Sequence, residues 1–242
     1  MLAQFCEVTA KLAKVDVEVV VADQKLKDSK DFKAKNITGK FPFLETPEGS
    51  LVESLAIAKH LARVGQNDLL GKDHFERAQV EQWAHWGLGH VMSNAFVIMQ
   101  AVFGWGGPNP TVATADYNDA NKALKEQLKV LNNQLNGKFI LGDKVTVADI
   151  VLAAVFLIPL QTVLDGGFRK AMAKATAWFE AVTALPEFVA VFGHVRACAK
   201  PVKPNLIPEE KKKKEAPKAA PKPKEEKKEE KKDINPLDAL PP

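Results

Sequence analysis

The segment from Lys40 to Ala62, KFPFLETPEGSLVESLAIAKHLA, constrains the fold of this chain more than any other stretch. The apolar residues from Phe41 to Leu44 predict a short strand, and the turn residues Thr46 to Gly49 predict a hairpin. Ser50 to Val52 then begins a return strand. Helical spacing of apolar residues starts immediately afterwards. The segment therefore predicts a β-hairpin that leads directly into a helix.

Two residues in this segment have special backbone roles. Pro42 lies in a strand but has no N–H to donate, so we expect it at an edge or bulge, with a cis peptide bond before it. A cis bond would turn the backbone of Phe41 outward. Ser54 is a good N-cap for the following helix. The free N–H groups and the partial positive charge of that helix start are suited to hold a carboxylate.

The order of strand, X-Pro, strand and Glu-Ser-x-Ala-Ile at Glu53–Ile57 resembles the glutathione-binding half of a glutathione transferase-type domain. The resemblance implies that the backbone of Phe41 and the pair Glu53 and Ser54 form a glutathione-type site, of vestigial character in this chain. A second interpretation stays open. Ser54 then only caps the helix, and Glu53 is a solvated turn residue.

Residues 1–65 are predicted to form a thioredoxin-like half around this hairpin. Leu2–Lys14 has the apolar spacing of a helix, Val15–Val21 is predicted to be a strand, and Asp28–Lys35 is predicted to be a short helix. The resemblance implies a first strand before the first helix, whereas this chain begins inside the helix. The first strand is therefore expected to be missing: either it has been lost, or Met1 is not the true start, or the fold is closed differently.

Residues 74–199 are predicted to form an all-helical half. A long helix is expected from His74 to Gly104, with Gly87 and Gly89 marking a kink or a close helix approach. Further helices are predicted at Val112–Asn136, after Thr146, at Phe168–Ala184 and at Glu187–Ala199. Thr146 and Asp149 have the spacing of a capping box. The helix that they start is apolar nearly all round and is predicted to be buried.

Charge separates the rest of the chain from its C-terminal segment. Residues 1–199 contain 21 Lys+Arg and 21 Asp+Glu, so the net charge of +4 comes from residues 200–242. A neutral body gives no basis for a nucleic-acid groove. Residues 200–242 consist mainly of Lys, Glu and Pro and are predicted to be a disordered linker that ends in NPLDALPP. The longest apolar run, Ile150–Leu160, is too short to span a membrane, which takes about 20 residues.

The sequence gives little support for a metal site or a phosphate-binding loop. Cys6 and Cys198 lie far apart without a CxxC motif, which is typical of a reducing compartment and predicts no metal site. Gly137-x-x-x-x-Gly142-Asp143-Lys144 lacks the lysine position and the strand of a phosphate loop. His85 and His90 are five residues apart and are predicted to point to different faces of a helix.

A glutathione transferase also needs a group that stabilises the thiolate, because the thiolate is the nucleophile. By resemblance this group is a Tyr, Ser or Cys near the end of the first strand. The only tyrosine is Tyr117, and no serine precedes Ser29. Cys6 and Thr9 are predicted to lie inside the first helix. We therefore expect the binding half of the site without its catalytic half, and no catalytic residue is assigned.

The segments FILGDKVTVADI and FRKAMAKATAWFEAVTALPEF, followed by the Lys/Glu/Pro linker, resemble the elongation factor 1 gamma family. The resemblance implies a glutathione transferase-like fold, a thioredoxin-like half packed on a helical bundle, in a fragment that lacks a separate C-terminal domain. It also implies a non-catalytic cytoplasmic scaffold without a cofactor, although glutathione could bind.

The implied partner is the guanine nucleotide exchange subunit of elongation factor 1 and, through it, the GTP-binding elongation factor. No direct nucleic-acid contact is expected, and a homodimer is a further expectation. Two alternatives stay open: a glutathione transferase enzyme, and a transferase-like scaffold of an aminoacyl-tRNA synthetase complex.

Overall fold

A computed structural model describes residues 1–66, 68–105 and 111–207. The chain divides into two units, residues 1–209 and 210–242, and the second unit lies outside the described residues. Within the first unit the N-terminal elements are, in order, α1 (Leu2–Ala13), α2 (Gln24–Asp28), α3 (Lys30–Lys35), β1 (Phe43–Thr46), β2 (Gly49–Val52) and α4 (Ser54–Val64). The C-terminal elements are α5 (His74–Trp86), the π-helix η1 (Gly87–Val91), α6 (Met92–Phe103), α7 (Thr114–Gln134), α8 (Val147–Thr162), α9 (Gly166–Lys170), α10 (Ala173–Thr183) and α11 (Pro186–Phe192).

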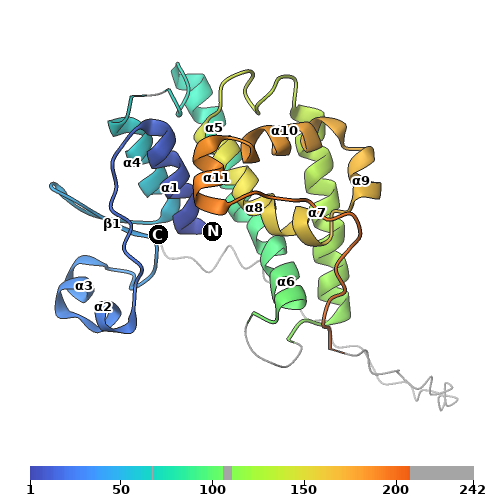
Figure 1. Cartoon of the computed structure of the whole chain (residues 1–242), viewed down its shortest axis with the longest axis horizontal. Coiled ribbons are helices and arrows are strands. Elements are labelled where there is room, and N and C mark those ends of the chain that lie inside the picture. The colour runs from blue at the N-terminus through green and yellow to red at the C-terminus, as the bar shows by residue number, and fades with distance from the viewer. Residues whose placement is uncertain (67, 106–110, 208–242) are drawn as a thin grey trace, which may run out of the picture. The chain divides into compact units, whose positions relative to one another are not determined.

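The predicted hairpin is confirmed. β1 and β2 pair antiparallel, with Phe43 opposite Val52 and Thr46 opposite Gly49. β2 leads straight into α4, which packs against α1 (Figure 1). The buried faces of the two helices share Phe5, Val8, Leu55 and Leu61 in the hydrophobic core.

The predicted strand at Val15–Val21 is wrong, because this segment has no regular secondary structure. Val19, Val20 and Val21 are 60%, 66% and 89% exposed. A strand is stabilised by hydrogen bonds to a neighbour, and among the described residues the sheet contains only β1 and β2. A valine-rich sequence without such a neighbour does not form a ladder, whatever its β propensity.

The predicted helix at Asp28–Lys35 corresponds to α3 (Lys30–Lys35), and a separate short helix, α2, precedes it and ends at Asp28. Ser29 ends α2 and begins α3, and its hydroxyl accepts a hydrogen bond from the N–H of Phe32. Asp23 caps α2 in the same way through the N–H of Leu26. Two caps six residues apart therefore start separate helices.

The predicted long helix from His74 contains a π-helical turn, η1, at the predicted glycines. η1 contacts α8, and a Cβ added at Gly87 would lie 3.0 Å from Cδ2 of Leu152. Gly87 therefore allows the close approach that the sequence predicted. The hydrogen-bond pattern of a π-turn, i to i+5, accounts for the irregularity at this point.

Helix α8 is the centre of the helical part, as predicted, with 13 of its 16 residues buried. Thr146 and Asp149 form the predicted capping box. The Asp149 carboxylate accepts hydrogen bonds from the N–H and the hydroxyl of Thr146, both at 2.9 Å. It also accepts from the N–H of Ile140 and from the indole N–H of Trp178, both at 2.8 Å. Asp149 therefore joins the loop before α8 and helix α10 to the start of α8.

The C-terminal helix is shorter than predicted. α11 ends at Phe192, before Gly193 with φ +73°, and the expected helical residues up to Ala199 are not helical. Residues 198–207, here called the strap, instead donate backbone hydrogen bonds to helix ends. Cys198 N–H and Val202 N–H donate to Leu160 O and Thr162 O in α8, and Asn205 N–H donates to Ala101 O in α6. The strap therefore supplies donors for carbonyls that a helix end leaves free.

The strap also changes where the predicted linker begins. Ile207 N–H donates to Val112 O, and Ile207 O accepts from the hydroxyl of Thr114 at the start of α7. Residues 200–207, predicted as linker, are thus hydrogen-bonded to the helical part, while residues 208–242 lie outside the described residues.

Across residues 1–66, 68–105 and 111–207, no single helix is long and apolar enough to cross a membrane. Helices α10 and α11 together have the length and apolar composition of a membrane span, but they are bent by 78° relative to each other.

Replacing the buried carboxylate tests the centre of the fold. Asp149→Ala removes the acceptor of four hydrogen bonds and leaves buried donors unpaired, so we expect a loss of about 2–4 kcal/mol in the free energy of unfolding. Asp143→Ala, an exposed residue in the preceding loop, is the control and should change stability by less than about 0.5 kcal/mol. Chemical denaturation measures both, and equal values for the two variants would contradict the role given to Asp149.

A pair of truncations tests the strap. A chain ending at Ile207 keeps the strap, whereas a chain ending at Ala199 loses the donors at Val202, Asn205 and Ile207. We expect the shorter chain to be less stable by about 2–4 kcal/mol. For a body of this size the melting temperature then falls by roughly 5–10 °C. Calorimetry showing identical midpoints for the two truncated chains would mean that the strap contributes nothing.

Candidate functional site

The three predicted site residues lie at one end of the hairpin. Phe43 pairs with Val52, so Phe41 comes two residues before this pair and Ser54 two residues after it. Continuing the antiparallel register places Phe41, Glu53 and Ser54 at the open end of the hairpin, where β2 enters α4. The structure thus brings together the residues that the sequence analysis selected.

The ring of Phe41 packs against side chains of α2 and α3. The peptide bond between Phe41 and Pro42 is cis, as predicted. The Phe41 ring stacks on Phe32 of α3 at 5.2 Å between centroids, and Nζ of Lys27 lies 5.8 Å from the centroid of the Phe41 ring. Because the ring is engaged with α2 and α3, the backbone of Phe41 is the part of this residue suited to contact a ligand.

Glu53 and Ser54 begin helix α4, but in different positions from those predicted. Glu53 is the N-cap, with φ +69° and ψ +113°, and no side chain caps the helix. Ser54 is the first helical residue and only 7% exposed, so its predicted N-cap role is wrong. A positive φ at a residue other than glycine is uncommon and is held by the surrounding structure. The first N–H groups of α4 have no side-chain acceptor and are suited to an anionic group.

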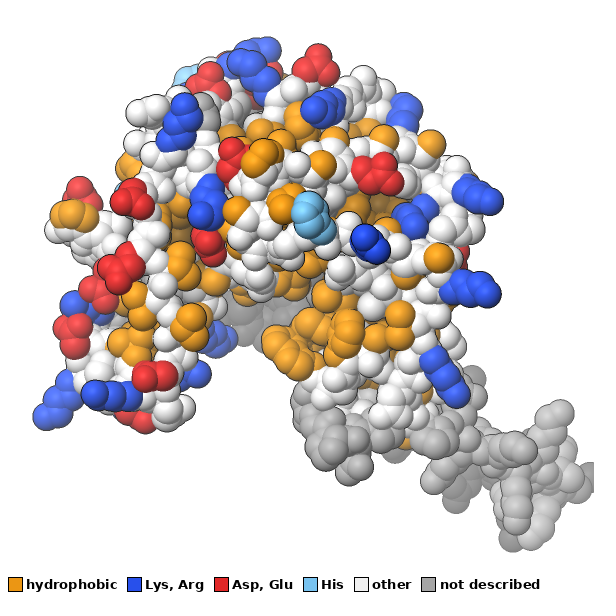
Figure 2. Space-filling model, in the orientation of Figure 1, with side chains coloured by type: hydrophobic (Ala, Val, Ile, Leu, Met, Phe, Trp, Pro, Cys, Tyr) orange, Lys and Arg blue, Asp and Glu red, His pale blue; other side chains and the backbone are white. Residues whose placement is uncertain are grey.

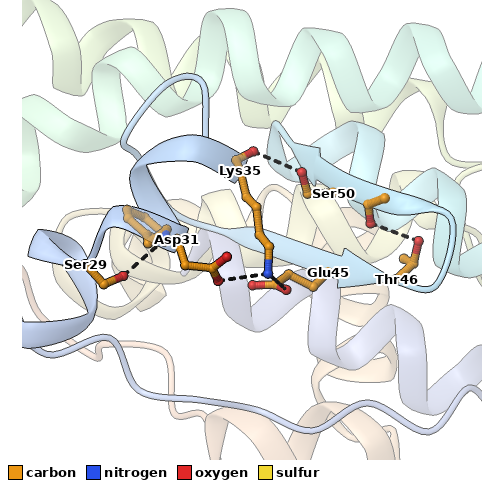
Figure 3. A network of polar contacts seen from close by, with 8 residues as sticks. Ser29, Asp31, Lys35, Glu45, Thr46 and Ser50 are labelled. Carbon is orange, nitrogen blue, oxygen red and sulfur yellow. Dashed lines mark hydrogen bonds and ion pairs between the residues drawn. The ribbon is translucent and has the colours of Figure 1, made fainter.

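Polar contacts hold the hairpin against α3 (Figure 3). Nζ of Lys35 lies 2.8 Å from Asp31 and 3.0 Å from Glu45, and the Ser50 hydroxyl donates to the carbonyl of Lys35 at 2.9 Å. The hydrogen bond to Asp31, followed by that to Glu45, raises the pKa of Lys35. The contacts are exposed, so they orient the hairpin more than they stabilise it. Sequence spacing indicates only the i,i+4 pair of Asp31 and Lys35.

The candidate thiolate-stabilising residues have structural roles. Cys6 is buried in α1, and its thiol donates to Ser54 O at 3.2 Å and to Leu2 O at 3.3 Å. Burial raises the pKa of Cys6 to about 12, so the group is a neutral thiol at physiological pH. The hydroxyl of Thr9 donates to Phe5 O at 2.8 Å within α1. Burial also raises the pKa of Tyr117 in α7. None of these contacts places a thiolate-stabilising donor beside Phe41 and Glu53.

The contact of Cys6 with Ser54 was not predicted. The two residues are 48 positions apart, and no local pattern in the sequence relates them. Its effect is to fix the first turn of α4 from the core side.

In the part of the chain that the structure describes, no group of three or more His, Cys, Asp and Glu residues is arranged to hold a metal ion. A groove of about 460 Å³ lies between α6 and α7, and a pocket of about 350 Å³ lies between the end of α4 and α5. Phe41, Glu53 and Ser54 line neither of them.

Helix α6 presents apolar side chains to solvent. It contains no charged residue, yet Phe96 and Phe103 are 43% and 59% exposed. Trp105, just after the helix, is 60% exposed and packs edge to face against Phe96. Figure 2 shows hydrophobic side chains gathered over the region of α6. A contiguous exposed apolar surface of this kind is typical of an interaction site.

Two family models match separate parts of this chain. Residues 1–63 match the family "Glutathione S-transferase, N-terminal domain", and residues 95–186 match "Glutathione S-transferase, C-terminal domain". Among solved structures, the GST-like domain of elongation factor 1-gamma from Saccharomyces cerevisiae aligns with a TM-score of 0.71 and 23% identity, over 84% of this chain and 94% of that one. A glutathione S-transferase-I bound with lactoylglutathione aligns with a TM-score of 0.69 and 24% identity, over 78% and 92% of the two chains.

Two relatives found by sequence share a higher identity with this chain than these two solved structures do. A probable elongation factor 1-gamma 1 from Arabidopsis thaliana is 36% identical over 230 residues, which are 87% of this chain and 53% of the relative. Elongation factor 1-gamma-A from Xenopus laevis is 33% identical over 179 residues, which are 70% of this chain and 38% of the relative. The chain thus spans about half the length, or less, of these relatives. The predicted fold and resemblance are confirmed: this chain has the glutathione S-transferase-like fold with its N- and C-terminal domains and is a homologue of elongation factor 1-gamma.

Proposed function

We propose that this protein is a non-catalytic scaffold subunit of the cytoplasmic elongation factor 1 complex. Its folded part anchors the guanine nucleotide exchange subunit, which recharges the GTP-binding elongation factor during protein synthesis. The observation that carries this proposal is the similarity to elongation factor 1-gamma over 87% of the chain. The hydrogen-bonded side chains of Cys6 and Thr9 and the burial of Tyr117 support the non-catalytic role.

The exposed apolar side chains of α6 support a specific contact with a protein. Phe96, Phe103 and Trp105 lie on or next to a helix without charges, in a body whose charges balance. A partner that covered them would bury apolar surface, and the affinity of such a contact depends little on salt. Aromatic side chains of this type often supply most of the affinity of a protein interface.

A glutathione-dependent enzyme is the second candidate, and the hairpin end favours the glutathione binding that such an enzyme requires. Glu53 is held at positive φ and the first turn of α4 has no side-chain cap. This arrangement leaves backbone donors for a carboxylate of a peptide such as glutathione. Binding there without a thiolate-stabilising residue would give a glutathione-type site of vestigial character, as the sequence predicted.

The scaffold role is tested by capture of the recombinant exchange subunit. We expect the full chain and a chain ending at Ile207 to capture it equally, at about 0.15 M and about 0.5 M salt, because apolar contacts are screened little. Phe103→Asp should weaken capture at least about tenfold, since a buried charge would oppose the contact.

Phe75→Asp is the matched control for that experiment. Phe75 lies in α5, is 73% exposed and is outside the α6 surface, so the same substitution should leave capture unchanged. Loss of capture on removal of residues 208–242, or by salt, would show that the charged segment is the binding element.

The enzymatic alternative is tested by conjugation of glutathione to an aryl halide. We expect a rate close to the uncatalysed one, because Cys6 is a buried neutral thiol and no other residue at the hairpin end lowers the pKa of the glutathione thiol. Cys6→Ala and the control Cys198→Ala should give the same rate as the unmodified chain. Rapid turnover that Cys6→Ala abolishes would identify a cysteine-type transferase instead.

A further inference from the structure

The segment between α1 and α2 has the residues of a strand but no neighbouring strand (Figure 1). From Val15 to Asp23 its backbone contains no helix, turn or bend. From Asp16 to Ala22 no backbone N–H or carbonyl takes part in a hydrogen bond with any described residue. The segment therefore presents a row of free donors and acceptors, which is the template that another strand requires.

Its side chains divide into a part that is anchored on the core and a part that is exposed. Val15 and Val17 pack against the hydrophobic core. Beyond them, the side chains of Val19, Val20 and Val21 are 60%, 66% and 89% exposed. β-Branched side chains pack well against the neighbours that an adjacent strand supplies. Three consecutive exposed valines on an unpaired backbone therefore form an apolar surface that no other part of the described chain covers.

The segment has none of the residues that usually protect an exposed strand edge. Proteins prevent the pairing of such edges with other chains by placing lysine or proline on them. Between Lys14 and Lys25 the sequence VDVEVVVADQ contains no Lys, Arg, Pro or Gly. Asp16 and Glu18 carry the only charges before Asp23, and both precede the three exposed valines. These valines are therefore open to a strand from outside.

The charge of Glu18 decides how two copies of the segment can pair. In a parallel pair in register, Glu18 of one copy would lie beside Glu18 of the other, and like charges opposite each other are destabilising. An antiparallel pair centred on Glu18 has the same fault. An antiparallel pair centred on Val20 avoids it, because Glu18 then lies opposite Ala22. Val19 lies opposite Val21 in this register, so the segment is complementary to itself.

A second copy also supplies the apolar neighbours that the exposed valines lack. Side chains alternate between the faces of a strand, so Val19 and Val21 lie on one face and Val20 on the other. In the pair centred on Val20, four valines gather on the first face, two from each copy. On the second face, Val20 packs against Val20 of the other copy. The sequence of the segment therefore favours a second copy over an unrelated strand.

We propose that two copies of this protein pair through Val19–Val21, in an antiparallel ladder centred on Val20. The ladder ends at Ala22, because the carboxylate of Asp23 accepts a hydrogen bond from the N–H of Leu26 and caps α2. The contact is short, and a pair of strands alone is only marginally stable in water. We therefore expect a weak dimer, with a Kd of about 10–100 µM.

The proposal goes beyond the scaffold role and does not depend on it. The pairing segment belongs to the N-terminal half, whereas the exchange subunit is assigned to the aromatic side chains of α6. It also assigns an interface to the homodimer that the resemblance led us to expect. Because each copy contributes the same segment, the contact closes on itself and stops at two copies.

Sedimentation velocity of the full chain, from about 5 to about 500 µM, tests the pairing. We expect an equilibrium between monomer and dimer that depends on concentration. Val20→Lys places two ammonium groups opposite each other and should weaken the dimer at least about tenfold. Val20→Thr keeps the β-branched shape and should change the Kd by less than about threefold.

Ile37→Lys is the matched control for Val20→Lys. Ile37 is 86% exposed and lies outside the segment, so the same change from an aliphatic side chain to lysine should leave the dimer unchanged. Phe103→Asp should also leave it unchanged, because α6 takes no part in the pairing. The melting temperatures of these variants should agree within about 2 °C, since exposed substitutions affect stability little. A loss of folding is thereby recognised.

Single cysteines test the register of the pair. In a Cys198→Ser background, Val20→Cys brings two thiols opposite each other, within reach of a disulfide. Diamide, which takes up the two electrons and two protons, should then give a covalent dimer. Glu18→Cys is the control, because its thiol lies opposite Ala22, and it should crosslink at least about tenfold more slowly.

Three results would overturn the proposal. The first is a chain that stays monomeric up to about 500 µM. The second is a dimer that Val20→Lys leaves intact, or that Ile37→Lys or Phe103→Asp dissociates, since the contact would then lie elsewhere. The third is crosslinking through Glu18→Cys that is as fast as through Val20→Cys, which would contradict the register.

Discussion

The hydrogen bonds to the carboxylate of Asp149 are the interaction on which the helical part of this protein depends. A buried carboxylate is costly unless its acceptor sites are filled, and here four donors fill them. The donors come from three separate places: the start of α8, the loop at Ile140 and the indole of Trp178 in α10. Burial nevertheless raises the pKa of Asp149, against the opposing effect of these donors. One side chain thus fixes the start of the core helix relative to two neighbours, and α8 in turn supports η1, α5, α6 and α1.

The sequence was sufficient to predict a structural feature where the residues that determine it lie close together in the chain. The hairpin and the capping box at Thr146 each depend on residues within a few positions, and the close approach at Gly87 depends on the absence of a side chain that would crowd Leu152. The sequence also selected Phe41, Glu53 and Ser54, and the pairing of Phe43 with Val52 brings them to one end of the hairpin. Their detailed roles differ, because the cap of α4 is Glu53 and not Ser54.

Features that depend on distant partners were not predicted. Val15–Val21 has strand propensity, but propensity without a neighbouring strand gives irregular backbone. The thiol of Cys6 meets Ser54 across 48 residues, and the strap meets α6 and α8 through backbone groups that carry no sequence signal. The positive φ of Glu53 is likewise set by its surroundings, since glutamate has no preference for that conformation. Tertiary contacts decide all of these features.

The π-turn η1 lets this region contain one more residue without changing the direction of the helix that follows. A π-turn contains about one residue more than an α-turn, whereas each residue of a regular α-helix corresponds to a rotation of about 100°. Because the π-turn absorbs its additional residue, Ala95, Ile98 and Ala101 of α6 keep facing the core. Deletion of one residue that turned η1 into an α-turn would leave α6 in nearly the same orientation, whereas the same deletion inside α6 would rotate all that follows it by about 100°. The π-turn is therefore the place in this helix where the loss of a residue disturbs the surface of α6 least.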